Sequence, residues 1–197
     1  MSLYSLLKQH VVDTTALLAA SHPIYAAMEV LVMKIPENVS LRTRGIATVT
    51  SFAGLGWLYA KGRDVSRAYF GIDQKCSELS QQIHDTGYAV CFAGAVSPFF
   101  YAAAGGSLEE TIYGTLGAMG LSVFSGPIMG YSLDAFRDLV GLQESHRLPR
   151  MVRTQSRRTK GFIAAGLLDS CLALFGAVYA VNTADEDVPE HSSMTNR

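Results

Sequence analysis

Apolar residues are concentrated in five blocks of about 20 residues, separated by stretches that carry most of the charged side chains. The blocks lie at 14–33, 44–60, 86–104, 111–133 and 161–181. About 20 predominantly apolar residues in a helix suffice to cross the hydrocarbon core of a bilayer. The pattern therefore predicts an all-α membrane protein with four transmembrane helices, arranged as two similar hairpins, and a fifth, C-terminal hydrophobic helix.

The fourth block is the strongest argument against a soluble helical bundle. Its residues, TIYGTLGAMGLSVFSGPIMGYSL at 111–133, include no charged side chain, whereas a soluble amphipathic helix needs a polar face. The first block is weaker, because His22, Pro23 and Glu29 interrupt it. The overall composition, 49% hydrophobic against 17% charged, also favours a membrane protein.

Basic residues are distributed unevenly between the two sets of connecting segments. If the N-terminus is cytoplasmic, 12 of the 16 Lys and Arg residues fall on the cytoplasmic side, as the positive-inside rule requires. The N-terminal segment lacks a small-residue cleavage site, so the first block is expected to remain as a helix. The predicted location is the cell inner membrane, with multiple passes and a cytoplasmic N-terminus.

The chain divides by composition into four parts. They are a four-helix membrane domain at 1–141, a basic cytoplasmic loop at 142–160, an additional hydrophobic helix at 161–181 and an acidic disordered tail at 182–197. The basic stretch RTQSRRTK is interpreted as a topology anchor or a contact with anionic lipid, not as a nucleic-acid site. The sequence leaves open whether 161–181 spans the membrane, lies on its surface or folds back around Asp169.

The two hairpins share a sequence pattern. DTTALLAASHPIYAA, which begins at Asp13, is matched by DTGYAVCFAGAVSPFFYAAA from Asp85, and each hairpin ends on an Arg-Asp pair, at Arg63 and at Arg137. A parallel repeat of this kind is one way in which transporters build a site between two halves. Short matches of common membrane residues also arise by coincidence, so the repeat alone does not define a function.

Charged residues in or near the apolar blocks are the candidates for transport and proton coupling. Asp134 directly follows the last residue of the fourth block and has Arg137 at i+3. Pairing with Arg137, or with the arginine of the other hairpin, would offset the cost of burying its carboxylate, and a pair that opens on protonation can couple transport to protons. The full candidate set is Asp13, Glu29, Arg44, Arg63, Asp85, Asp134 and Arg137.

These candidates also have purely structural interpretations. Asp13 and Asp85 are placed at predicted helix starts, where an aspartate acts as an N-cap. The two hairpin-ending arginines would be snorkelling anchors. Glu29 and Arg44 would form a surface salt bridge that contributes little to stability.

Small residues and prolines form a second set of features. Ser122, Gly126 and Gly130 recur every four positions, as in small-xxx-small helix contacts. They predict a helix-packing face, used either within the monomer or in a homo-oligomer. Pro98 and Pro127 are expected to interrupt their helices and to free backbone groups that line a cavity.

The sequence contains no recognisable catalytic, cofactor or metal motif. The three cysteines, Cys76, Cys91 and Cys171, have no ligand spacing, and P-loop, dinucleotide, zinc and nucleophile-elbow patterns are absent. The protein is therefore expected to be a non-enzyme without catalytic residues, cofactor or metal, and to use a proton gradient instead of ATP.

The ordered motifs resemble the bacterial L-alanine exporter family (AlaE). The resemblance rests on VVDTTA with MEV downstream, on RTRG leading to GWLYAKGRD, on SPFFY, and above all on S-x-x-x-G-x-x-x-G-Y-x-L-D-x-x-R from Ser122 to Arg137. It covers about 11–141. The segment GIATVTSFAGLGW departs from the family, since it lacks the expected proline and asparagine, and the spacing from Asp85 to Pro98 is longer.

This resemblance implies a four-helix inner-membrane protein with both ends cytoplasmic, which exports L-alanine under the proton-motive force and self-associates through its glycine motif. The family's charged membrane residues map by position onto the seven candidates above. The predicted partners are L-alanine or a similar small neutral amino acid, membrane lipid and further copies of the chain, and not nucleic acid. The alternative is a non-transporting membrane scaffold or partner-binding subunit that uses its glycine-rich helix face.

Overall fold

The computed structural model describes residues 3–32, 37–103 and 107–186, and every regular element in these ranges is helical. The prediction of an all-α protein is therefore confirmed. In chain order the elements are α1 (Leu3–Ala27), the π-helical segment η1 (Met28–Val32), α2 (Glu37–Thr50), the π-helical segment η2 (Ser51–Leu55), α3 (Gly56–Phe70), α4 (Glu78–Ala103), α5 (Leu108–Leu139), α6 (Arg150–Arg153) and α7 (Arg157–Glu186).

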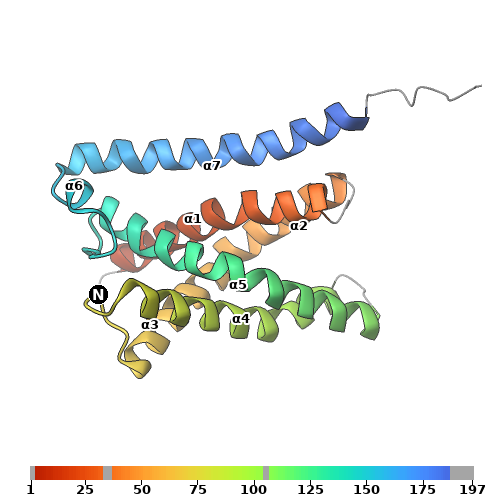
Figure 1. Ribbon diagram of the computed structural model, residues 1–197, viewed down its shortest axis with the longest axis horizontal. Helices are drawn as coiled ribbons and strands as arrows, with labels where there is room; N and C mark the ends of the chain where they lie inside the picture. Colours follow the sequence, from red (N-terminus) through yellow and green to blue (C-terminus); the bar gives the residue numbers. More distant parts are fainter. Residues whose placement is uncertain (1–2, 33–36, 104–106, 187–197) are drawn as a thin grey trace, which may run out of the picture.

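The long helices run side by side along the longest axis of the molecule (Figure 1). α4 packs along α5, and α1 packs against both α5 and α7. The N-terminal parts of α1, α4 and α7 meet the C-terminal parts of α3 and α5 at one end, which also holds α6. We call this end of the bundle the basic end, because its connections carry most of the Lys and Arg residues.

The second apolar block is not a single regular helix. It is divided by η2, where Gly54 has φ = 136°, a backbone conformation that residues other than glycine rarely adopt. Pro98 and Pro127, in contrast, lie inside the continuous helices α4 and α5. The expectation that these prolines interrupt their helices was wrong, because the packing around an apolar helix can accommodate a proline.

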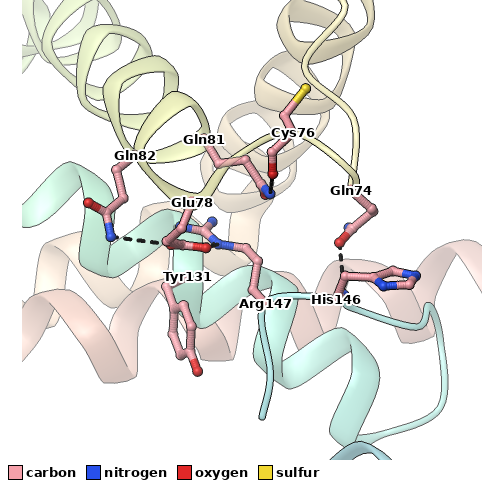
Figure 2. A pocket seen from close by; sticks show the side chains of 8 residues that line it. All are labelled: Gln74, Cys76, Glu78, Gln81, Gln82, Tyr131, His146 and Arg147. Carbon is pink, nitrogen blue, oxygen red and sulfur yellow. Dashed lines mark hydrogen bonds and ion pairs between the residues drawn. The ribbon is translucent and has the colours of Figure 1, made fainter. Parts of the chain in front are cut away.

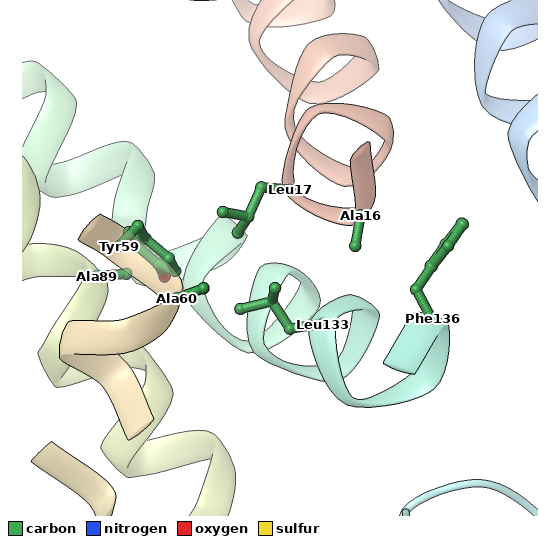
Figure 3. Close-up of a cluster of buried hydrophobic side chains, with 7 residues drawn as sticks. All are labelled: Ala16, Leu17, Tyr59, Ala60, Ala89, Leu133 and Phe136. Atoms are coloured by element: carbon green, nitrogen blue, oxygen red, sulfur yellow. The ribbon is translucent and has the colours of Figure 1, made fainter. Parts of the chain in front are cut away.

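The core is small and contains mainly small and medium-sized side chains. Large apolar side chains instead face outward, as in Phe99, Phe124 and Phe162, which are 76%, 74% and 79% exposed. Small residues inside and large apolar residues outside are typical of helices that pack within lipid. The buried cluster consists of Ala16, Leu17, Tyr59, Ala60, Ala89, Leu133 and Phe136 (Figure 3).

Within the described ranges, three helical stretches are long and apolar enough to cross a membrane: Leu3–Val32, Thr111–Leu139 and Arg157–Val181. These stretches fit a membrane location. The described residues of the predicted blocks at 44–60 and 86–104 also fall within helical elements but are not among the three. Four spans plus a fifth helix, the inner membrane and the cytoplasmic N-terminus therefore stay predictions.

The C-terminal parts of the chain contain more helix than their composition predicts. α6 lies within the predicted basic loop, and α7 begins at Arg157 and continues to Glu186, five residues into the predicted acidic tail. The polar residues at both ends of α7 lie outside the apolar block at 161–181, so hydrophobicity alone does not predict that they are helical. Residues 187–197 of that tail lie outside the described residues.

Candidate functional site

A group of charged side chains is buried at the basic end and connects the two hairpins. None of their side chains is more than 8% exposed. Ionised groups buried among apolar helices are expensive unless they are paired. We call this group the charge network; it comprises Asp13 of α1, Arg63 and Arg67 of α3, Asp85 of α4, Asp134 and Arg137 of α5, and Arg147 of the connection between α5 and α6.

Arg63 is the central residue of the network, and its side chain is completely buried. Its Nε and Nη2 donate to the two oxygens of Asp85 at 2.8 and 3.0 Å, while Nη1 and Nη2 donate to Asp134 at 3.1 and 2.8 Å. Nη2 also donates to the Gly130 carbonyl at 3.0 Å. One guanidinium thus connects α3 to both α4 and α5 through charge-assisted hydrogen bonds.

Two further arginines approach the same two aspartates. Arg67 donates from Nη2 to Asp85 at 2.9 Å and from Nη1 to Asp134 at 3.1 Å. Arg147 donates from Nη1 to Asp85 at 2.9 Å and to Asp134 at 3.0 Å. In this closed arrangement, two buried carboxylates therefore face three guanidinium groups, whose positive charge stabilises the ionised carboxylates.

Arg147 lies outside the predicted transmembrane segments. The edge of its guanidinium formed by Nε and Nη2 faces a third acidic residue. Its Nη2 and Nε donate to Glu78 at 2.5 and 3.1 Å. Burial lowers the pKa of Arg147. The hydrogen bonds to Glu78 and Asp134 raise it by more than burial lowers it, so the pKa lies above the ordinary value. The guanidinium remains charged at every physiological pH.

Arg137 forms the second connection between the hairpins. Its Nε and Nη2 donate to the two oxygens of Asp13 at 2.6 and 2.8 Å, and its Nη1 donates to Asp64 at 2.9 Å. The pairing is therefore reciprocal: the arginine that ends each hairpin binds the aspartate near the start of the other one. Both pairs use the same Nε and Nη2 edge of the guanidinium.

Of the two pairings considered for Asp134, the structure contains the one with Arg63, the arginine of the other hairpin, while Arg137 turns toward α1. Two structural expectations for these residues were wrong. Asp13 and Asp85 are not N-caps, because α1 already begins at Leu3 and α4 at Glu78. The two arginines are buried and paired, so they do not snorkel to solvent.

Glu29 and Arg44 meet at the opposite end of α1 from the charge network. Arg44 forms an ion pair with Glu29, and the Ser40 hydroxyl donates to the same carboxylate at 2.7 Å. The Tyr179 hydroxyl of α7 lies 2.8 Å from Ser40 Oγ. The side chains of Glu29 and Arg44 are 14% and 11% exposed, so the pair is not the predicted surface salt bridge. The structure thus brings five of the seven candidates together and places the other two elsewhere.

The glycine stripe of α5 faces α4. A Cβ atom on Gly126 would lie 2.9 Å from the Thr86 Cα, and one on Gly130 would overlap the Asp85 carboxylate. Ser122 is buried and donates within its own helix, to the Ala118 carbonyl at 2.8 Å. The stripe therefore packs two helices of one chain and allows Asp85 to approach the α5 backbone.

Sequence reasoning missed two of the three arginines that face the aspartates. Arg67 follows Arg63 by one helical turn, and this i+4 spacing on one helix face could have indicated it. Arg147 was assigned only to a basic loop. No local signal predicts its contact, because the contact depends on how the connection after α5 folds back.

A polar pocket of about 420 Å³ lies beside the charge network. Figure 2 shows Glu78 and Arg147 paired across it, and Gln74 and His146 at another side. In the described part of the chain, no group of three or more His, Cys, Asp or Glu side chains is arranged to hold a metal ion. The pocket is lined by Gln74, Cys76, Glu78, Gln81, Gln82, Tyr131, His146 and Arg147.

Comparison of the chain with protein-family models, curated proteins and solved structures finds no match. The resemblance to the L-alanine exporters therefore rests on the motifs themselves.

Proposed function

We propose that this protein is an exporter that moves L-alanine, or a similar small neutral amino acid, across the inner membrane and is driven by the proton-motive force. The observation that carries the proposal is the buried contact of Arg63 with Asp85 and Asp134, which connects the two hairpins at the basic end. Ionisable groups buried in an apolar helix bundle usually serve transport or proton transfer.

The geometry of Arg63 provides a means of coupling. Protonation of Asp85 or Asp134 removes the negative charge that holds the guanidinium, and so weakens the connection between α3 and the second hairpin. Two similar halves that separate and rejoin in this way expose a central site alternately to each side of the membrane. Proton binding then drives the change of state, because it favours the open arrangement over the closed one.

The alternative, a non-transporting scaffold, requires an outward-facing glycine surface for a partner helix. Gly126 and Gly130 instead contact α4 of the same chain, which favours the transporter. The seven charged candidates and the L-alanine exporter motifs support it as well, because they place charge inside the bundle.

Efflux of labelled L-alanine tests the proposal. Cells that lack their own alanine exporters are loaded with alanine and compared with and without this protein, before and after addition of a protonophore. Faster efflux that collapses with the protonophore is the expected result. Unchanged efflux, in cells whose membranes contain the inserted protein, contradicts L-alanine export and favours the scaffold.

A further inference from the structure

The pocket beside the charge network contains one cationic and one anionic side chain in direct contact. Arg147 presents its Nε and Nη2 edge to Glu78, and Nη1 is held by Asp85 and Asp134. The guanidinium carbon lies 5.4 Å from the centre of the Tyr131 ring, which supports the group from one face. The cation of the pocket is thus fixed in position.

Glu78 is placed differently from Arg147. Its side chain is 44% exposed, whereas that of Arg147 is 1% exposed. Glu78 therefore lies at the rim of the pocket, where its carboxylate can turn toward solvent when another carboxylate replaces it on Arg147. A carboxylate from solution can then occupy the vacated Nε and Nη2 edge, which matches such a group in bidentate geometry.

A second feature of the pocket also points to a ligand. The Gln81 side chain is 2% exposed, and its Oε1 has no hydrogen-bond partner, although its Nε2 donates to the Cys76 carbonyl at 3.0 Å. A buried acceptor without a donor is expensive, and each such case requires an explanation. A ligand that brings N–H donors into the pocket would satisfy Gln81 Oε1.

We propose that this pocket is the cytoplasmic entry site for a zwitterionic amino acid, with Arg147 binding the carboxylate and Gln81 Oε1 and the displaced Glu78 binding the ammonium. The inference rests on the proposed function and identifies where its substrate is recognised. One cationic and one anionic group match a neutral amino acid, and the volume falls in the range of about 300–1,000 Å³ typical of small-molecule sites.

This site communicates directly with the charge network through Arg147. The ligand carboxylate takes the place of Glu78 on Nε and Nη2, while Nη1 keeps its hydrogen bonds to Asp85 and Asp134.

Cys76 lines the pocket and provides a probe of its occupancy. In a chain with Cys91→Ser and Cys171→Ser, Cys76 is the remaining thiol. The rate of its reaction with a maleimide is measured on the detergent-solubilised full chain, with L-alanine, propionate or ethylamine added. L-alanine is expected to slow the reaction at concentrations at which propionate and ethylamine, which each carry one of its two charged groups, have no effect.

Substitutions test which side chains of the pocket bind L-alanine. Arg147→Lys and Gln81→Met are each expected to raise the concentration of L-alanine for half-protection about tenfold, the effect of one hydrogen bond to a charged group. Gln155→Met is the matched control, because exposed Gln155 also donates from Nε2 to a backbone carbonyl but lies outside the pocket. Equilibrium binding of labelled L-alanine to the unsubstituted chain and to the same three variants repeats the comparison without the thiol.

The outcomes separate this inference from the proposed function. If cells export alanine but L-alanine neither protects Cys76 nor binds more weakly to the two variants, the pocket is not the entry site and the exporter stands. Protection that is equal in all variants overturns the roles of Arg147 and Gln81. Protection without export supports the site and overturns the exporter, and the absence of both protection and export overturns both.

Discussion

Arg137 of α5 donates two parallel hydrogen bonds to Asp13 of α1, at 2.6 and 2.8 Å, although 124 residues separate them in the chain. Both side chains are almost completely buried. Loss of Arg137 leaves Asp13 as an uncompensated buried charge, which in proteins costs about 3–5 kcal/mol, whereas loss of Asp13 leaves Arg137 its ion pair with Asp64.

Arg137→Gln should therefore lower the free energy of unfolding by about 3–5 kcal/mol, Asp13→Asn should lower it by less because Arg137 keeps its pair with Asp64, and the double variant should lose clearly less than the sum. The measurement is denaturation of the detergent-solubilised protein, arranged as a double-mutant cycle. Arg158→Gln, at an exposed position of α7, is the control and should change stability by less than about 0.5 kcal/mol. Additive losses would show that the two side chains do not interact.

Gly130→Ala should disrupt the charge network from within the α5 backbone. The added Cβ would overlap the Asp85 carboxylate, so Asp85 must move away from Arg63, at a cost of about 1–3 kcal/mol. Thermal unfolding and alanine efflux should both decline.

Gly120→Ala is the matched control on the same helix, because a Cβ there meets no atom within 4 Å. It should be neutral, or stabilising by up to about 1 kcal/mol through helix propensity. Equal behaviour of the two variants would contradict the close approach of Asp85 to Gly130.

Asp134→Asn should abolish proton-coupled export while the protein still inserts into the membrane. The substitution removes a titrating group that accepts hydrogen bonds from Arg63, Arg67 and Arg147. Glu144→Gln, which removes an exposed carboxylate in the connection after α5, should export normally. Near-normal efflux by Asp134→Asn, at equal amounts of protein in the membrane, would exclude Asp134 from the mechanism.

Tyr179→Phe tests whether α7 is attached to the first hairpin at the end opposite the charge network. The hydroxyl of Tyr179 lies 2.8 Å from that of Ser40, which in turn donates to Glu29. Its removal should lower stability by about 1 kcal/mol, as measured by thermal unfolding. Tyr4→Phe, at a position 76% exposed, should have no measurable effect, and equal results for both tyrosines would refute the attachment.

The helices were predictable from the sequence because an apolar block of sufficient length is a local property. The presence of Asp134 and Arg63 among the functional candidates was predictable for a related reason, since each lies within three residues of the end of an apolar block. The choice of partners was not predictable. An i+3 spacing allows Asp134 to meet Arg137, but each side chain turns toward whichever helix packs beside it, and that depends on tertiary contacts.

Features of the connections were the hardest to foresee. Arg147 reaches the aspartates only because the segment after α5 folds back, held by the hydrogen bond from the Ser145 backbone N–H to Asp138 at 2.7 Å. The unpartnered Gln81 oxygen likewise exists only in the folded chain. Neither has a sequence signature, since glutamines and arginines near helix ends are common.

The reciprocal pairing of the hairpins has an implication for the origin of the chain. A single ancestral hairpin with an aspartate near its start and an arginine near its end could have neutralised both charges by associating with an identical copy about a two-fold axis. Each copy would have supplied the acid for the other's base. The present molecule has the arrangement expected when two such genes fuse in tandem, and Arg63 with Asp85 and Arg137 with Asp13 would then be the two halves of a former subunit interface.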